Sequence, residues 1–347
     1  MRYKLLGKSG LRVSEICLGT MTFGEDWGFG ASGDESRAMY DAFREAGGNF
    51  IDTANIYTNG TSETMLGEFM QGHRENVVLA TKFSNSGVMG DPNAGGNNRK
   101  AMMREVEASL KRLQTDYIDL YWLHIWDKLT PIEEVMRGFD DLVSSGKVLY
   151  VGISDAPAWY VARANTLAEL RGWSQFVGLQ IEYSLIERTP EHELLPMAKE
   201  LGITVTPWSP LAGGILAGKY LDMESDDAKT GRYGSEMFQG ALVPERDRKT
   251  RIAQEVVNIA NELGVSASQV ALAWLRHKDS TMIPIIGTRK LAQLNDNLAS
   301  LNVKLSDEHK NRLNEVSRIE PIFPNKFFQQ DFVGKFVYGG VRDKIDA

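Results

Sequence analysis

The sequence predicts an α/β protein folded as a (β/α)8 TIM barrel, and two observations lead to this prediction. Short apolar runs alternate with longer amphipathic runs from about residue 15 to about residue 300. The short runs number eight, at 15–20, 49–54, 76–83, 116–124, 148–154, 176–183, 203–209 and 281–287. Such alternation is typical of parallel strands joined by right-handed helical crossovers. Eight units over about 250 residues match the size of a closed barrel.

The composition of the individual runs supports this assignment. The eight short runs are rich in Val, Ile, Leu and aromatic residues, as expected of strands buried on both faces. The run 36–47 places Met39, Ala42, Phe43 and Ala46 on one stripe and ends in a glycine, which predicts an amphipathic helix. Runs 97–113 and 132–146 repeat this arrangement, the second of them after a proline at the helix start.

An open, doubly wound sheet is the competing architecture. Such a sheet normally carries a glycine-rich dinucleotide turn after its first strand. Here the first strand leads into LGTMTFGEDWGFG, whose glycine spacing does not match GxGxxG. The barrel is therefore favoured.

Three segments lie outside the alternation, within what we expect to be one domain spanning 1–347. Residues 3–14 alternate around two glycines and predict a hairpin at the bottom of the barrel. Residues 211–245 form a long polar insertion after the seventh strand, too long for a simple connection. The tail 318–347, after a C-terminal helix, contains many aromatic residues, so we expect it to pack over the active-site face.

Composition narrows the function classes. The 347 residues carry 39 Lys and Arg against 46 Asp and Glu, a net charge of −7, which argues against nucleic acid as a partner. The single cysteine, Cys17, excludes a disulfide framework and a zinc site of several thiolates. With no apolar run long enough for a membrane helix or a signal peptide, we expect a cytoplasmic protein with no membrane partner. Its oligomeric state stays open.

Polar side chains at successive strand ends predict a catalytic site. Asp52 ends the second strand, with Tyr57 shortly after it, Lys82 ends the third strand, and His124 ends the fourth. The carboxyl ends of barrel strands share one face, so these groups can converge. A neighbouring ammonium should lower the pKa of the phenol and release its proton at neutral pH. Asp52 would hold Lys82, and His124 would donate to a substrate oxygen. The set suits protonation of a carbonyl oxygen while a hydride reaches the carbon, and needs no metal.

Each of these residues also has an ordinary structural explanation. A tyrosine near a strand end usually serves packing, an Asp–Lys pair between strands is usually structural, and His124 can be a satisfied core histidine. The joint placement at three adjacent strand ends favours catalysis, because buried charges are costly without a purpose.

Two later segments predict anion binding. The segment 208–220, WSPLAGGILAGKY, offers Ser209 and backbone N–H groups around Gly213 and Gly214, which suit a pyrophosphate. The segment 287–298 follows the eighth strand and opens a helix, whose free amides, dipole and Arg289 suit a phosphate monoester. Loops after strands seven and eight commonly build phosphate sites in barrels.

These motifs together resemble the aldo-keto reductase family. The resemblance runs from LGTMTFG through GGNFIDTANIY, ATKF, DYIDLYWLH, VLYVGIS and WSPLAGGILAGKY to IIGTRKLAQLNDNL. It implies a barrel that binds NADPH or NADP+ in extended form, with Tyr57 as general acid and base and Asp52, Lys82 and His124 completing a tetrad. It implies that Trp208 stacks on the nicotinamide, Gln180 and Ser154 hold its carboxamide, and Arg289 takes the 2′-phosphate. The full set of implied cofactor-binding residues is Thr20, Met21, Ser154, Asp155, Gln180, Trp208, Ser209, Leu211, Gly213, Gly287, Thr288, Arg289, Gln293 and Asn297.

One residue departs from the family pattern. Family members commonly carry Asn after the strand-five serine, whereas this sequence reads GISD and places Asp155 there. A carboxylate lacks the amide donor, so either burial raises its pKa or its hydrogen bonding differs.

The sequence therefore predicts NADPH-dependent reduction of aldehydes or ketones, a reversible reaction on a small-molecule carbonyl. Trp27 and Trp126 are the expected substrate contacts, together with the insertion and the tail. The alternative is a cofactor-sensing regulatory subunit of the kind that this family also contains. A metal-dependent hydrolase is disfavoured, because the five histidines form no ligand cluster at the strand ends.

Overall fold

The chain forms a (β/α)8 barrel, in agreement with the sequence prediction. The computed structural model describes residues 1–222, 229, 245–278 and 281–346. Eight parallel strands form one sheet in the order β10-β3-β4-β5-β6-β7-β8-β9. The strands are β3 (Cys17–Gly19), β4 (Phe50–Asp52), β5 (Val78–Phe83), β6 (Ile118–Leu123), β7 (Val148–Ser154), β8 (Phe176–Glu182), β9 (Thr204–Trp208) and β10 (Ile285–Gly287).

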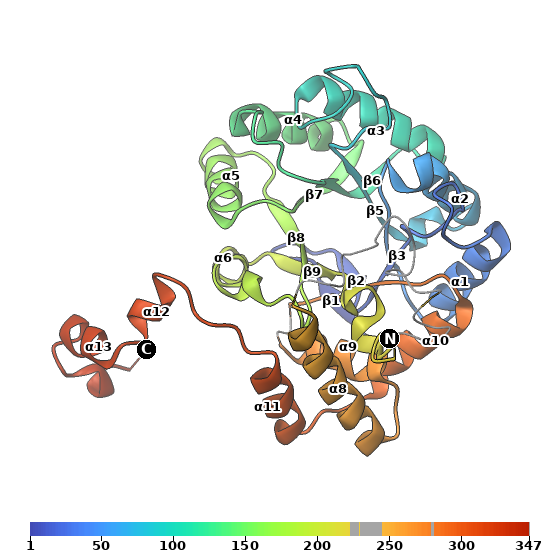
Figure 1. Ribbon diagram of the computed structural model, residues 1–347. Helices are drawn as coiled ribbons and strands as arrows, with labels where there is room; N and C mark the ends of the chain where they lie inside the picture. Colours follow the sequence, from blue (N-terminus) through green and yellow to red (C-terminus); the bar gives the residue numbers. More distant parts are fainter. Residues whose placement is uncertain (223–228, 230–244, 279–280, 347) are drawn as a thin grey trace.

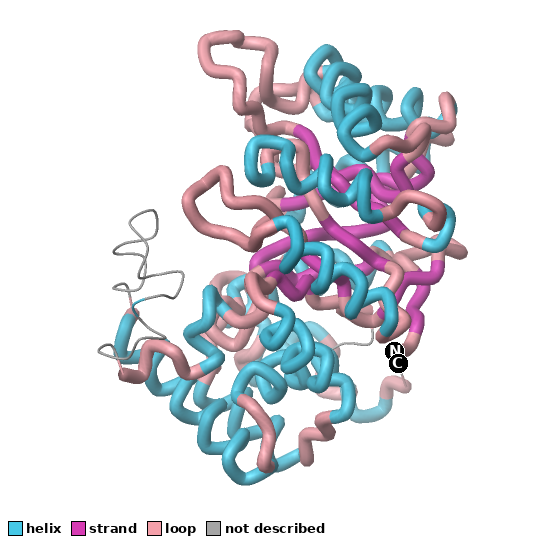
Figure 2. The backbone as a smooth tube through the Cα atoms, turned by 90° about the vertical axis from the view of Figure 1, so that its right-hand side faces the viewer, coloured by secondary structure: helices cyan, strands magenta, loops and turns pink. Residues whose placement is uncertain are grey.

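Helices surround the sheet (Figure 1). Those of the barrel and its C-terminal end are α1 (Gly33–Glu45), α2 (Thr61–Phe69), α3 (Arg99–Leu113), α4 (Ile132–Ser144), α5 (Ala158–Arg171), α6 (Leu194–Leu201), α8 (Arg246–Leu263), α9 (Ala267–Lys278), α10 (Leu291–Ala299) and α11 (Asp307–Val316). Figure 2 shows the strands running side by side within this helical layer. No helix in the described part of the chain has the length and apolar content needed to cross a membrane.

The predicted helices form close to their expected bounds. Ser32 and Asn98 cap α1 and α3 by accepting from backbone amides, and α4 follows a proline. Met39 and Phe43 of the predicted stripe are fully buried, whereas Ala46 lies just past the helix and is exposed.

The predicted strands are confirmed: β7 has its predicted bounds, and the other seven are shorter than expected. The eighth begins only at Ile285, because Pro284 has no N–H to give to a sheet ladder. The backbone N–H of Ile283 donates to the Val205 carbonyl of β9 at 2.9 Å, which joins the two ends of the sheet.

A predicted hairpin closes the bottom of the barrel. Strands β1 (Tyr3–Leu5) and β2 (Arg12–Ser14) pair antiparallel. The Gly7 amide donates to the Thr204 hydroxyl at 2.7 Å, at the start of β9. Leu6 and Val13 are fully buried in a cluster with residues of the strand starts. The opposite face of the barrel is thereby left for the site.

The fully buried Trp122 fills the barrel interior. Gly152 on β7 and Gly178 on β8 lie beneath its indole, where an added Cβ would come within 2.3 Å and 2.6 Å of ring carbons. These two glycines are therefore required by packing rather than by a turn.

The C-terminal tail does not lie where the sequence led us to expect. Its helices α12 (Asn325–Phe328) and α13 (Asp331–Val337) stand apart from the barrel (Figure 1), and Phe323 and Phe336 are each 80% exposed. Most of the predicted insertion 211–245 lies outside the described residues.

Candidate active site

The four predicted catalytic side chains come together at the carboxyl ends of β4, β5 and β6. Gly19, Asp52 and Ala80 lie in register across β3, β4 and β5, and β5 continues three residues further to Phe83. Lys82 lies two residues beyond Ala80 and therefore faces the same side of the sheet. Tyr57 begins a short 3₁₀ turn after β4, and His124 directly follows β6.

Lys82 is the centre of this group. Its ammonium is fully buried and donates to Asp52 Oδ2 at 2.5 Å, to the Thr53 carbonyl at 2.7 Å and to Tyr57 Oη at 3.0 Å. An ammonium has three protons, so each finds an acceptor. The other Asp52 oxygen accepts from Gln180 Nε2 at 3.0 Å. The ion pair is thus fully hydrogen-bonded, as a buried pair must be.

Burial and charge oppose each other in setting the pKa values. Burial alone lowers the pKa of Lys82, but the Asp52 carboxylate and the Tyr57 oxygen raise it, and the net direction is upward. Burial raises the pKa of Tyr57, and Lys82 offsets only part of that rise. The expectation of a lowered phenol pKa is therefore wrong, because loss of water outweighs the single nearby cation. The phenol stays protonated at neutral pH.

His124 is a neutral imidazole. Burial, reinforced by the charge of Lys82, lowers its pKa to about 3. Its ring meets the Tyr57 ring edge to face, with centroids 5.9 Å apart and planes at 84°. Both rings border the same cavity.

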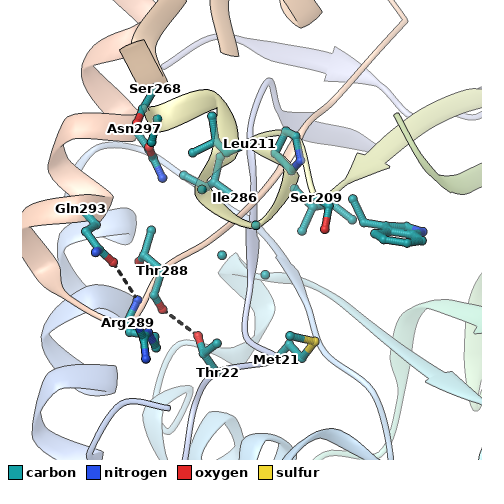
Figure 3. A pocket seen from close by; sticks show the side chains of 18 of the residues that line it. Met21, Thr22, Ser209, Leu211, Ser268, Ile286, Thr288, Arg289, Gln293 and Asn297 are labelled. Atoms are coloured by element: carbon teal, nitrogen blue, oxygen red, sulfur yellow. Dashed lines mark hydrogen bonds between the residues drawn. The ribbon is translucent and has the colours of Figure 1, made fainter. Parts of the chain in front are cut away.

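A cavity of about 1140 Å3 extends from these rings to the N-terminus of α10. Its volume is slightly above the range of about 300–1,000 Å3 that is typical of small-molecule sites. Figure 3 shows its far end, where side chains from α9, α10 and the loops after β3 and β9 converge. The predicted residues that line it are Asp52, Tyr57, His124, Met21, Ser154, Asp155, Gln180, Trp208, Ser209, Leu211, Gly213, Gly287, Thr288, Arg289, Gln293 and Asn297.

Four predicted residues do not line the cavity. Lys82 is fully buried behind Asp52 and Tyr57, to which it donates. The Thr20 hydroxyl is buried between the Asp52 carbonyl and the Ser62 hydroxyl, where it fastens β3 to β4. Trp126 packs against the aromatic rings at the start of α5 instead. Trp27 stacks edge to face on Tyr57 with centroids 6.5 Å apart, so it lies beside the catalytic ring.

The departure from the family pattern at Asp155 has a structural counterpart. Trp208 Nε1–H donates to Asp155 Oδ1 at 3.1 Å, and burial raises the pKa of that carboxyl. The neighbouring Ser154 hydroxyl is buried and lacks a hydrogen-bond partner of normal geometry among the described residues, although it borders the cavity. A buried orphan hydroxyl at a cavity wall fits a ligand with a polar group, such as a carboxamide.

The two predicted anion sites have fewer free amides than the sequence suggested. Gly213 and Gly214 adopt left-handed conformations, with φ of 64° and 100°, but the Gly214 N–H donates to the Leu211 carbonyl at 3.0 Å. At α10 the Leu291 N–H donates to the Glu35 carboxylate of α1 at 2.5 Å. The expectation of free amides is wrong at these two positions, because groups of the chain itself accept from them.

The far end of the cavity is nevertheless lined by a cationic side chain, that of Arg289. The Arg289 amide donates to Gln293 Oε1 at 3.2 Å, which orders the start of α10 (Figure 3). An arginine at a helix N-terminus fits a phosphate monoester. The whole lining thus fits an extended dinucleotide with a carboxamide at one end and phosphate at the other.

Sequence reasoning missed several lining residues. The Thr22 hydroxyl donates to the Thr288 carbonyl at 2.6 Å and bridges the loops after β3 and β10. Phe29 faces the catalytic end, and Ser268 comes from the first turn of α9. The glycine-rich stretch around Phe29 was a usable signal, whereas nothing in the sequence marks a serine at the start of α9.

Comparisons with known proteins point to one family. The model of the Aldo/keto reductase family matches residues 15–318. The chain is 39% identical over 330 residues to a norsolorinic acid reductase of Emericella nidulans, covering 92% of this chain and 82% of the relative. It is 39% identical to an aryl-alcohol dehydrogenase [NADP(+)] of Phanerodontia chrysosporium, with 92% and 86% covered. It is 40% identical to an uncharacterized oxidoreductase of Bacillus subtilis, with 91% and 96% covered.

The family match spans nearly the whole barrel, including every strand that carries a residue of the candidate site. The relatives are similar over most of their own length as well. The chain is an oxidoreductase that belongs to the aldo/keto reductase family.

Proposed function

We propose that the protein reduces aldehydes and ketones to alcohols with NADPH, using Tyr57 as the proton donor. The observation that carries this proposal is the position of Lys82 Nζ, 2.5 Å from Asp52 and 3.0 Å from the Tyr57 hydroxyl, beside a large cavity. A purely structural ion pair would not need a phenol as its third ligand. The relative whose name carries NADP(+) supports the same cofactor here.

The cavity lining supplies the residues that would hold the cofactor. Bound there, the nicotinamide would supply the hydride. Ser154, Gln180 and Trp208 would hold and orient the nicotinamide end, and Ser209, Leu211 and Gly213 would lie along the pyrophosphate. Arg289, Gln293 and Asn297 would hold the adenosine end and its 2′-phosphate. The orphan hydroxyl of Ser154 supports this orientation, because a carboxamide would satisfy it.

Tyr57 would act as a proton donor that is already protonated at neutral pH. Its raised pKa keeps the phenol protonated at neutral pH, and an alkoxide forming on a carbonyl is basic enough to take that proton. Lys82, held by Asp52, would stabilise the phenolate left behind. The neutral His124 would donate one hydrogen bond to the substrate oxygen and so place it against the phenol. In the direction of alcohol oxidation the same phenol would have to be deprotonated first.

We further propose aromatic carbonyls as the substrate class. Phe29 lines the cavity, and Trp27 lies against it with ring centroids 6.1 Å apart and planes tilted by 39°. Trp27 also meets Tyr57 edge to face. These rings place an aromatic, apolar surface next to the proposed proton donor. Two relatives carry names that refer to an aryl alcohol and to norsolorinic acid.

The experiment is turnover of NADPH with a panel of aromatic and aliphatic aldehydes, comparing the wild type with Tyr57→Phe. We expect kcat to fall about 1,000-fold in Tyr57→Phe, since the variant keeps the ring and loses only the transferable proton. Affinity for NADPH, measured by fluorescence titration, should stay within about twofold, because a change below 0.5 kcal/mol is typical of a residue that makes no essential contact.

Tyr3→Phe is the matched control, because Tyr3 sits in the hairpin at the opposite end of the barrel and lies 56% exposed. A Tyr57→Phe enzyme with wild-type turnover would contradict the mechanism. A wild-type protein that binds NADPH but reduces no carbonyl would favour the cofactor-sensing alternative.

A further inference from the structure

One side chain next to the tetrad touches His124 directly. Ser84 follows β5 with a left-handed φ of 101°, and this turn brings Asn85 over the end of β6. Asn85 Nδ2 lies 3.1 Å from His124 Nδ1. Asn85 is a polar residue that the sequence analysis did not select.

The backbone on both sides of this contact is fixed. Asn55 Nδ2 donates to the Asn85 carbonyl at 2.9 Å and to Glu105 Oε2 at 2.9 Å. Asn55 is 8% exposed, and both of its partners accept, so the orientation of its amide is determined. The backbone N–H of His124 donates to the backbone carbonyl of Phe83 at 3.1 Å. Neither residue can shift without breaking these hydrogen bonds.

We propose that Asn85 is a positioning residue that fixes the tautomer of His124, with the proton on Nε2. A neutral imidazole has one N–H, and a ring nitrogen that accepts from an amide cannot carry that proton. With Nδ1 accepting from Asn85, Nε2 carries the hydrogen and is the nitrogen left to donate into the cavity. The inference rests on the proposed function, because only a substrate oxygen makes a donor at that position useful.

The opposite arrangement would defeat the chemistry. If the Asn85 oxygen accepted from Nδ1–H instead, Nε2 would present a lone pair to the carbonyl oxygen, which is itself only an acceptor. Substrate binding would then place two acceptors against each other. The Asn85 amide therefore fixes the tautomer and orientation of the His124 ring, as hydrogen-bond partners of histidine do in other functional sites.

Few charged groups act on the imidazole. Lys82 lowers its pKa, and the Asp52 carboxylate is paired with that ammonium. Tyr57 presents a neutral phenol, and Glu105 is separated from Asn85 by the Asn55 amide. Since Asn85 is neutral, no described group in contact with Nδ1 draws a second proton onto the ring.

The test combines the tautomer of His124 with the pH profile of Asn85→Asp. This near-isosteric change replaces a donor with an acceptor. Long-range 1H–15N spectra of the wild-type protein should show His124 as the Nε2–H tautomer, and the His124→Gln spectrum identifies its signal among the five histidines. In Asn85→Asp, the spectra should show His124 as the Nδ1–H tautomer at alkaline pH and as the doubly protonated imidazolium at acidic pH.

Turnover should follow the same change. In Asn85→Asp we expect kcat at alkaline pH to fall about 100-fold, the loss typical of one transition-state hydrogen-bond donor, and to recover as pH falls and Nε2 regains its proton. The wild type should show no such step, since its histidine stays neutral. Asn93→Asp is the control, because it places the same charge on the same exposed loop without touching His124.

The outcomes separate this inference from the proposed function. An Nδ1–H tautomer in the wild type, or an Asn85→Asp variant with wild-type spectra and pH profile, would overturn the role of Asn85. If Asn85→Asp does not fold, Asn85→Ala carries the test, with a mixture of tautomers expected. The spectra need no turnover, so the tautomer is decided even if Tyr57→Phe shows that the proposed reaction is wrong.

Discussion

Lys82 shows how a single buried charge can serve both folding and chemistry. It is fully buried, yet all three of its protons are accepted by groups on β4 and on the loop that follows. Removing this cation would leave the Asp52 carboxylate buried without a counter-charge. An unpaired buried charge destabilises a protein far more than a buried ion pair does. The position should therefore tolerate neither a neutral nor an enlarged side chain.

We expect Lys82→Met to lower the free energy of unfolding by about 3 kcal/mol, because Asp52 loses its partner inside the protein. The double variant Lys82→Met with Asp52→Asn should recover part of this loss, since no lone charge remains. Burial already raises the pKa of Asp52, and a carboxyl with a raised folded pKa destabilises the protein above its unfolded pKa. The deficit of the single variant should therefore shrink as pH falls.

Urea denaturation of the wild type, both single variants and the double variant measures this cycle. If the double variant were no more stable than Lys82→Met, the loss would arise from the missing lysine stem rather than from an unpaired charge.

At the scale of elements, the start of α10 decides how the far end of the cavity can bind an anion. The Leu291 N–H is taken by the Glu35 carboxylate, which places a negative charge at the helix N-terminus. The cationic contribution to this end of the cavity therefore comes from the Arg289 side chain. Selection of a 2′-phosphate should consequently depend on that arginine more than on the helix dipole.

We expect Arg289→Gln to weaken NADPH binding by about 2 kcal/mol, or roughly 30-fold in Kd, the value of a hydrogen bond to a charged group. The Kd for NADH, which lacks the 2′-phosphate, should hardly change. Fluorescence titration with both cofactors provides the measurement.

Lys290→Gln is the control for Arg289→Gln, because this neighbouring cation is exposed and does not line the cavity. An equal loss for NADH and NADPH would show that Arg289 does not face the 2′-phosphate.

At the scale of the whole molecule, the aromatic side chains of the C-terminal tail do not pack against the barrel. Asn325 donates to the His192 carbonyl at 3.0 Å, but the aromatic side chains beyond it are exposed. Phe327 and Phe332 meet each other edge to face, with centroids 6.0 Å apart. The barrel core is complete without them.

We expect removal of residues 321–347 to change the free energy of unfolding by less than about 0.5 kcal/mol, as for other surface changes. Urea denaturation of the shortened and full-length chains tests this, and binding of a hydrophobic dye should fall when the exposed aromatics are removed. A loss above about 2 kcal/mol would indicate that the tail packs on the barrel in solution.

Much of the fold was predictable because the barrel repeats one simple pattern. Eight apolar runs with helices between them leave few other architectures, and the strand ends then bring Asp52, Lys82 and His124 to one face. The aromatic content of the tail, by contrast, predicted packing that the structure does not show. Composition records that a segment has apolar side chains, but not which surface receives them.

The sequence by itself determined the barrel, the convergence of Asp52, Tyr57, Lys82 and His124 at one face and the position of the loops after β9 and β10 that border the cavity, because these depend on local periodicity and on strand ends. Only the tertiary structure decided the direction of the Tyr57 pKa, the use of the α10 amide by Glu35 and the contact of Asn85 with His124. Each of these depends on burial or on hydrogen bonds between residues far apart in the chain. Such effects are set by distance in space, which no linear spacing encodes.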